Sequence, residues 1–167
     1  MKFKCTIVIT YNYNSDNNHY GIVNNLGDMV VSPIYEELYW IDEENGILAA
    51  KLNGKWGVID YKGKEIVAHE YKEMNGYNGF VIAEDKNRRS IMMNANGNVI
   101  IPLGKYALSC YNGWVVWAED EDKYALINTK GEIVLPFKNY GKMEPIYGRT
   151  YKYFHDNVMC KIGRAHV

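Results

Sequence analysis

The sequence has 167 residues, of which 47% are hydrophobic and 14% aromatic, and its formal net charge is −1. This apolar content is enough for a folded core and argues against a disordered chain, while the balanced charge offers no basic stripe for nucleic acid. No apolar run approaches the roughly 20 residues that a membrane helix needs, so we expect no membrane insertion.

The chain starts with a strand-like segment, residues 3–13, that leads through a polar stretch to Tyr20-Gly21. It resembles the strand that comes before the aromatic residue in each later copy of the pattern described below. We therefore interpret residues 1–19 as the end of a preceding repeat.

A hairpin pattern follows and is clearest at residues 56–67, where apolar runs flank the connection Asp60-Tyr-Lys-Gly63. An Asp side chain can bond the backbone two residues on, and Gly63 supplies the positive φ that a type I turn with a following bulge requires. The same connection recurs along the chain, with its glycine at intervals of 36, 34 and 34 residues. The predicted turns are residues 24–27, 60–63, 94–97 and 128–131.

A second landmark lies between the turns, where a glycine opens a strand-like run. These glycines are Gly46, Gly79, Gly113 and Gly148. Tyrosine-bearing segments at residues 33–35 and 69–71 are predicted to be either a short strand or an irregular crossing, and no segment has helical periodicity. The expected fold is all-β, with tandem antiparallel β-hairpin repeats of about 34 residues. The array is expected to be open, either solenoid-like or an incomplete propeller.

The repeating unit resembles the WG repeat family, also called KWG repeats. Gly54-Lys-Trp-Gly-Val-Ile-Asp60 is the clearest match, whereas Tyr20-Gly21 and Tyr124-Ala125 keep part of the aromatic-glycine pair and Ser90-Ile91 keeps neither residue. The resemblance covers about residues 20–157 and implies a bacterial, β-rich repeat protein without an assigned function.

The resulting division of the chain assigns a repeat to each copy of the pattern. Residues 162–167 are set apart, because Ile-Gly-Arg-Ala-His-Val is what one frame of a common sequencing-adapter oligonucleotide encodes, and such a scar is excluded from fold reasoning. The expected segments are 1–19 (end of a preceding repeat), 20–54, 55–88, 89–122 and 123–157 (repeats one to four), 158–161 (start of a fifth repeat) and 162–167 (artefact).

Neither the cysteines nor the histidines form a pattern that indicates chemistry. Cys5, Cys110 and Cys160 are far apart and odd in number, and the histidines lack metal-ligand spacing. The acidic run 119–122 lacks the glycine and the alternating ligands of a calcium loop, which favours a solvated hairpin connection. We expect no catalytic residues, no metal and no cofactor, so the chain is predicted not to be an enzyme.

Aromatic residues are the remaining candidates for function, with 15 tyrosines and four tryptophans. Those in register with the turn, Tyr20, Trp56 and Tyr124, are predicted to pack neighbouring units together. Tyr111, Trp114 and Trp117 do not recur between copies, so they are the predicted contacts with a protein or glycan partner. The hypothesis is a non-catalytic binding or scaffold module; the alternative is an accessory repeat domain of a larger enzyme.

Overall fold

The computed structural model describes residues 5–10, 18–111, 115–139, 144–146, 150–155 and 158–162. These residues form strands and connecting turns, with no helix among them, and therefore no helix that could cross a membrane. The chain divides into a first unit, Met1–Lys105, and a second unit, Tyr106–Val167. The fold class predicted from the sequence, an all-β array of antiparallel hairpins, is confirmed.

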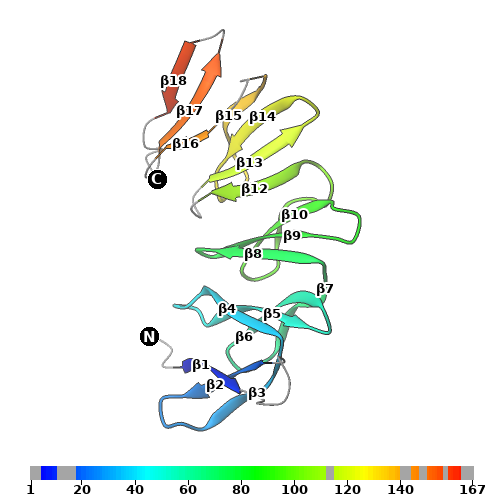
Figure 1. Ribbon diagram of the computed structural model, residues 1–167, viewed down its shortest axis with the longest axis vertical. Coiled ribbons are helices and arrows are strands. Elements are labelled where there is room, and N and C mark those ends of the chain that lie inside the picture. Colours follow the sequence, from blue (N-terminus) through cyan, green and yellow to red (C-terminus); the bar gives the residue numbers. More distant parts are fainter. Residues whose placement is uncertain are drawn as a thin grey trace. The chain divides into compact units, whose positions relative to one another are not determined.

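The first unit contains three antiparallel sheets, each a meander of strands adjacent in sequence (Figure 1). Sheet A has three strands, and sheets B and C have four each. Sheet A comprises β1 (Cys5–Thr10), β2 (His19–Asn24) and β3 (Met29–Tyr35); sheet B comprises β4 (Glu37–Asp42), β5 (Ile47–Leu52), β6 (Lys55–Asp60) and β7 (Glu65–Tyr71); sheet C comprises β8 (Glu73–Tyr77), β9 (Phe80–Glu84), β10 (Ser90–Asn94) and β11 (Val99–Ile101).

The second unit contains two more meanders of the same kind. Sheet D comprises β12 (Ala107–Tyr111), β13 (Val115–Asp120), β14 (Lys123–Ile127) and β15 (Ile133–Lys138); sheet E comprises β16 (Glu144–Ile146), β17 (Thr150–His155) and β18 (Val158–Ile162). Every strand pair in the two units is antiparallel, and none of the five sheets closes on itself.

The sheets are offset by half a repeat from the sequence pattern. Residues 55–88, one copy of the pattern, supply β6 and β7 to sheet B and then β8 and β9 to sheet C. Lys72 lies between β7 and β8, where the chain passes from sheet B to sheet C. Its amide donates a hydrogen bond to the carbonyl of Glu84, the last residue of β9, at 2.8 Å. Each copy therefore spans two sheets, so the chain itself links every sheet to the next.

The four predicted turns share one hydrogen-bond pattern, which confirms the prediction made for them. In the second turn, Asp60 Oδ1 accepts from the amides of Lys62 and Lys64, both at 2.9 Å, and the amide of Gly63 donates to the Asp60 carbonyl at 2.9 Å. Asn24, Asn94 and Asn128 make the same set of bonds. The φ angles are 89° at Gly27, 84° at Gly63, 81° at Gly97 and 84° at Gly131.

A fifth turn of the same design lies between β9 and β10, where the sequence contains no glycine. Asp85 Oδ1 accepts from the amides of Asn87 and Arg89 at 2.8 and 2.9 Å, and Arg88 occupies the left-handed position with φ 61°. The hydrogen-bond design of this turn is not evident from the sequence, because Arg88 stands where the other four turns have glycine.

The tyrosine-bearing segments, whose form the sequence left open, are the ends of β3 and β7. Tyr35 pairs in register with Tyr20, and Tyr71 pairs with Trp56, each across a bulge of two extra residues in the later strand. Both tyrosines are buried, with 5% and 8% of their surface exposed. These segments are therefore strands that end in a buried aromatic residue.

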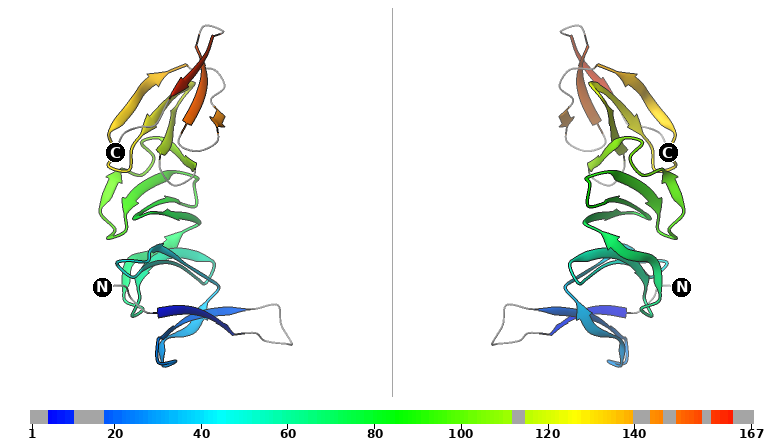
Figure 2. Two further views of the ribbon diagram at one scale, coloured as in Figure 1. Left: turned by 90° about the vertical axis from the view of Figure 1, so that its left-hand side faces the viewer. Right: turned by 90° about the vertical axis from the view of Figure 1, so that its right-hand side faces the viewer.

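Sheet B lies between sheets A and C (Figure 2). It contributes side chains to a core on each of its faces. Because successive residues of a strand point to opposite faces, Leu48 and Ala50 pack against sheet A while Ile47 and Ala49 pack against sheet C. Trp56 joins the core shared with sheet C, where its ring meets that of Tyr39 edge-on at a centroid distance of 5.5 Å. The predicted packing role of Trp56 is thereby confirmed.

Candidate functional site

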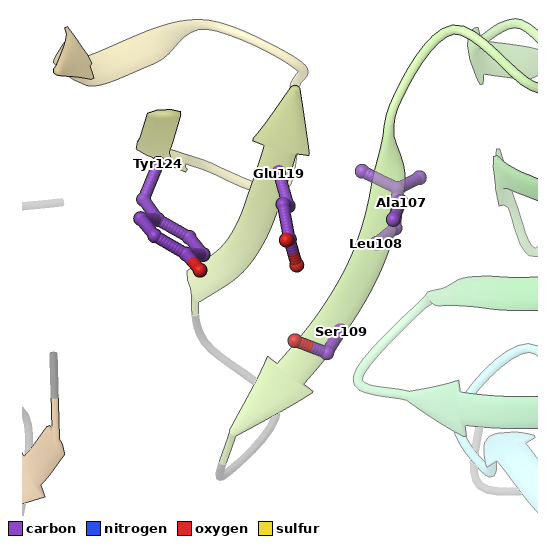
Figure 3. A pocket seen from close by; sticks show the side chains of 5 residues that line it. All are labelled: Ala107, Leu108, Ser109, Glu119 and Tyr124. Atoms are coloured by element: carbon purple, nitrogen blue, oxygen red, sulfur yellow. The ribbon is translucent and has the colours of Figure 1, made fainter. Parts of the chain in front are cut away.

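A hollow of about 270 Å3 opens on sheet D (Figure 3). Figure 3 shows the carboxylate of Glu119, the phenol of Tyr124 and the hydroxyl of Ser109 directed into this space, and the backbone of β12 forms one of its sides. Among the described residues its lining is Ala107, Leu108, Ser109, Glu119 and Tyr124. The hollow therefore combines an acidic group, an aromatic ring and a small apolar wall.

The strand register explains why these residues meet. Ala107 in β12 pairs with Glu119 in β13, which in turn pairs with Tyr124 in β14. Directly opposed residues of antiparallel strands lie on one face with Cβ atoms roughly 4.5–5.5 Å apart. The three residues consequently form a row across the sheet, and Ser109 lies two positions along β12 from Ala107.

The acidic run beside this row forms the connection between β13 and β14, as predicted. Glu119 and Asp120 end β13, Glu121 takes a left-handed φ of 54° in the turn, and Lys123 begins β14. Residues 119–123 are all exposed. Within the described part of the chain, Glu119 makes no ion pair, so its carboxylate faces the hollow uncompensated.

Sheet B contains an equivalent row in which the charge is compensated. Glu37, Lys51 and Trp56 occupy the register positions of Ala107, Glu119 and Tyr124. Lys51 Nζ lies 2.7 Å from Glu37 Oε1 and 5.6 Å from the centroid of the Trp56 ring. The hydrogen bond to Glu37 raises the pKa of the Lys51 ammonium. One chain thus builds this row in two chemically different forms.

The predicted partner-binding residues fall next to the hollow in sequence. Trp117 pairs in backbone register with Ser109 and precedes Glu119 by two positions, while Tyr111 ends β12 opposite Val115. Trp114 lies outside the described residues, and so do the side chains of Tyr111 and Trp117. Their part in binding stays a prediction.

The other aromatic residues in register with the turn differ in burial. Tyr20 is half-buried and packs against the core between sheets A and B. Tyr124 is half-buried and lines the hollow, a position that the sequence did not predict. The sequence did not predict a site at Ala107, Leu108, Ser109 and Glu119 either. The signal that could have found them is the position two residues before the connection that leads into the WG-like strand, which holds Lys51 before Asn53-Gly54 and Glu119 before Glu121-Asp122.

No group of three potential metal ligands occurs within the described ranges. Cys5 and Cys110 are both half-buried. His69 Nδ1 lies 2.8 Å from Glu65 Oε2 and its ring stacks on Tyr35 at 6.0 Å, so this histidine is used in the packing of sheet A on sheet B.

The sheets, the shared turns and the double-faced cores define a β-repeat protein built from tandem hairpins. The sequence pattern of the WG-containing repeat matches residues 20–56, 56–87 and 124–148, more than half of the chain. The chain belongs to the WG-containing repeat family.

Solved structures with a comparable arrangement of strands include Hsv2 of Kluyveromyces lactis, with 9% identity and a TM-score of 0.48, covering 88% of this chain and 55% of Hsv2. A second is BamB from Moraxella catarrhalis, with 13% identity and a TM-score of 0.41, covering 86% of this chain and 52% of BamB. The chain spans about half the length of these structures. No curated protein matches it.

Proposed function

We propose that this chain is a non-catalytic binding module that recognises a protein partner through sheet D. The proposal rests on a difference between two kinds of position within each repeat. The residues that recur between copies form the turns and the cores. By contrast, the pair of opposed residues on the first two strands of a sheet, in the row that leads to the Trp56 position, differs from sheet to sheet. Its members are Glu37 and Lys51 in sheet B, Glu73 and Glu84 in sheet C, and Ala107 and Glu119 in sheet D.

Sheet D is favoured over the other sheets because the hollow and the aromatic-rich segment 111–117 share its strands β12 and β13. Tyr111, Trp114 and Trp117 are the proposed contacts. Aromatic side chains contribute large contact areas at interfaces, and a few of them carry most of the binding energy. The hollow on the same two strands would admit one projecting side chain of the partner.

The test presents the full chain to a displayed library of random peptides and, separately, to a glycan array. We expect peptide ligands whose affinity falls at least about tenfold in Trp114→Ser and Trp117→Ser, as for aromatic anchors at other interfaces. Tyr61→Ser, which changes a half-buried aromatic residue of the sheet B turn, is the matched control and should leave the affinity unchanged.

Circular dichroism would verify that each variant keeps its strand content. Ligands that bind the two tryptophan variants as tightly as the original chain would remove sheet D from the proposal. Binding to glycans alone would show that the partner class is wrong.

A further inference from the structure

Sheets B and C are each covered on one face by the sheet that precedes them, and the same contact recurs in both places. Gly63 in the turn of sheet B lies against Val31 of sheet A, and Gly97 in the turn of sheet C lies against Val67 of sheet B. A Cβ built on these glycines would be 3.2 and 3.0 Å from Cγ2 of the respective valine. On the covered face of sheet B, Ile59 is fully buried. In both sheets, the face beside the turn glycine is therefore closed by another sheet.

Sheet A has the equivalent face on the side away from sheet B, and none of the described residues closes it. Ile22 of β2 is part of the core with sheet B, so its neighbour Val23 lies on the opposite face. Val23 holds the register position of Ile59, yet it is only half-buried, and its pair Met29 is 53% exposed. A Cβ built on Gly27, the turn glycine of sheet A, would have open space around it.

Sheet A is nearly without charge. Charged residues make up 23% of the chain. The described part of sheet A, residues 5–10 and 19–35, contains one of them, Asp28, together with the histidine His19. The Asp28 carboxylate accepts a hydrogen bond from Asn24 Nδ2 at 3.0 Å, within its own turn. Two copies of this sheet could therefore meet without bringing several like charges together, and depletion of charge is typical of the centre of a protein interface.

Leu26 distinguishes the turn of sheet A from the other turns of the same design. Its side chain is 80% exposed, whereas the equivalent exposed residues are the polar Lys62, Asn96 and Lys130. Lys62 stays exposed although sheet A covers sheet B. A covering sheet of the same chain thus gives no reason for a leucine at this position. An exposed leucine beside an open apolar face indicates a partner that also reaches over the turn.

We propose that the outer face of sheet A, which comprises Val8, Val23, Met29 and the turn residue Leu26, binds the same face of a second copy of this chain. Val8 belongs to this face because its neighbour Ile7 packs toward sheet B. The dimer has twofold symmetry, so Leu26 and Met29 of each copy pack on Val8 and Val23 of the other, and the contact closes after two copies. This association is independent of the binding function proposed for sheet D.

The size of the outer face sets the strength of the association. Three strands of six or seven residues span roughly 20 Å by 14 Å at the usual rise and spacing of β-strands. The resulting area, on the order of 300 Å2 a side, is well below the ~800 Å2 a side of a stable interface. We therefore expect a weak dimer that exchanges with the monomer, with a dissociation constant of about 10–500 μM.

The test measures the association of the full chain by sedimentation equilibrium at about 5 μM to 1 mM, a range that brackets the expected constant. The molar mass should rise from that of a monomer to that of a dimer. In NMR spectra over the same range, the amide signals of Val8, Val23 and Leu26 should move with concentration. Raising the salt concentration should not weaken the dimer, because the contact is apolar and salt screens only charges.

The decisive variants are Leu26→Lys and Met29→Lys, which place two like charges in the contact, one from each copy. Because like charges brought together in an interface cost several kcal/mol, the association constant should fall at least about tenfold in either variant. Val99→Lys is the matched control. Val99 opens the strand after the sheet C turn, as Met29 does in sheet A, and it is 55% exposed. This control should leave the association unchanged, and circular dichroism would verify the strand content of all three variants.

Three outcomes would overturn the proposal. The original chain could stay monomeric at the highest concentration, which would leave the outer face of sheet A without this partner. Growth beyond the dimer would show a contact between two different faces. Equal losses in Leu26→Lys and Val99→Lys would show general apolar association. None of these results would affect peptide binding through sheet D, which is measured with Trp114→Ser and Trp117→Ser.

Discussion

Gly57, the glycine of the WG pair, is required by the strand that follows the turn. A Cβ built on Gly57 would lie 2.7 Å from the carbonyl oxygen of Val67 and 2.9 Å from Cγ of His69. Gly21 meets the same obstacle, with the carbonyl oxygen of Val31 at 2.5 Å. At both positions the later strand bulges over the glycine by two extra residues. The glycine of the family motif is therefore explained by the close approach of the following strand's backbone to this position.

Replacing Gly57 with alanine should destabilise the chain by about 1–3 kcal/mol, since the added methyl group must push the bulge of β7 away. The measurement is the free energy of unfolding in urea. Ala125 holds the equivalent position in sheet D, where β15 contains only one extra residue between its pairings with Tyr124 and Leu126. The reverse change Ala125→Gly should therefore cost no more than about 1 kcal/mol. A loss below this value for Gly57→Ala would contradict the steric explanation.

Replacing Arg88 with glycine should stabilise the chain. Arg88 holds φ 61° in a turn whose four counterparts have glycine, and its side chain is exposed. A non-glycine residue in this region carries strain of about 1–3 kcal/mol, while glycine carries an entropic cost of about 0.5–1 kcal/mol. Arg88→Gly should consequently raise the free energy of unfolding by about 0.5–1 kcal/mol. Arg88→Ala, which removes the side chain but keeps the Cβ, should bring no gain, and an equal gain in both would assign the effect to the side chain.

At the scale of the elements, Tyr39 of β4 fixes the first strand of sheet C. Its hydroxyl donates to the carbonyl of Met74 at 2.8 Å and accepts from the amide of Gly76 at 3.1 Å. Gly76 has no room for a side chain, because a Cβ would lie 2.6 Å from Cγ1 of Ile41. Strand β8 is thereby held by a side chain of the preceding sheet as well as by its own partner β9.

Tyr39→Phe should cost about 1–3 kcal/mol, because two backbone groups lose their partner. Burial is the main cause that raises the pKa of Tyr39 to about 12, from 10.0. The contribution of this group to stability is therefore complete below pH 10 and is lost as the pH rises toward 12. Urea unfolding at pH 9, 10 and 11 should show a shallower decline for Tyr39→Phe than for the original chain. Parallel declines would contradict this assignment, since Tyr35 and Tyr71, whose pKa values are also raised, remain in both proteins.

For the whole molecule, the sequence predicts local features better than long-range pairing. The turns were predicted because Asp60 and Gly63 contain the whole mechanism within four residues. The half-repeat offset was not, because only Lys72 separates the end of β7 from the start of β8, and no short segment indicates that these two strands belong to different sheets. The hollow was missed for the same reason, since Ala107, Glu119 and Tyr124 come from three strands.

The family pattern and the structure also differ in what they detect. The matched segments leave residues 88–123 uncovered, yet β10 and β11 in sheet C and β12 and β13 in sheet D belong to meanders of the same kind as sheet B. Ser90 and Ile91 replace the aromatic-glycine pair there, while the Asn94 turn keeps its hydrogen bonds. The turn design is therefore present in this copy although the aromatic-glycine pair is absent.

The last prediction concerns the stability of sheet B relative to sheet A. Leu48, Ala49 and Ala50 in β5 are fully buried in succession, because both faces of sheet B are covered. In β1, the equivalent strand of sheet A, Ile9 is 41% exposed and no residue is fully buried. In an array held together by nearest-neighbour contacts, the sheet with two covered faces should open only when the unit unfolds. Hydrogen exchange followed by NMR should therefore show the amides of β5 and β6 exchanging at least about tenfold more slowly than those of β1, and equal protection in β1 and β5 would contradict this order of stability.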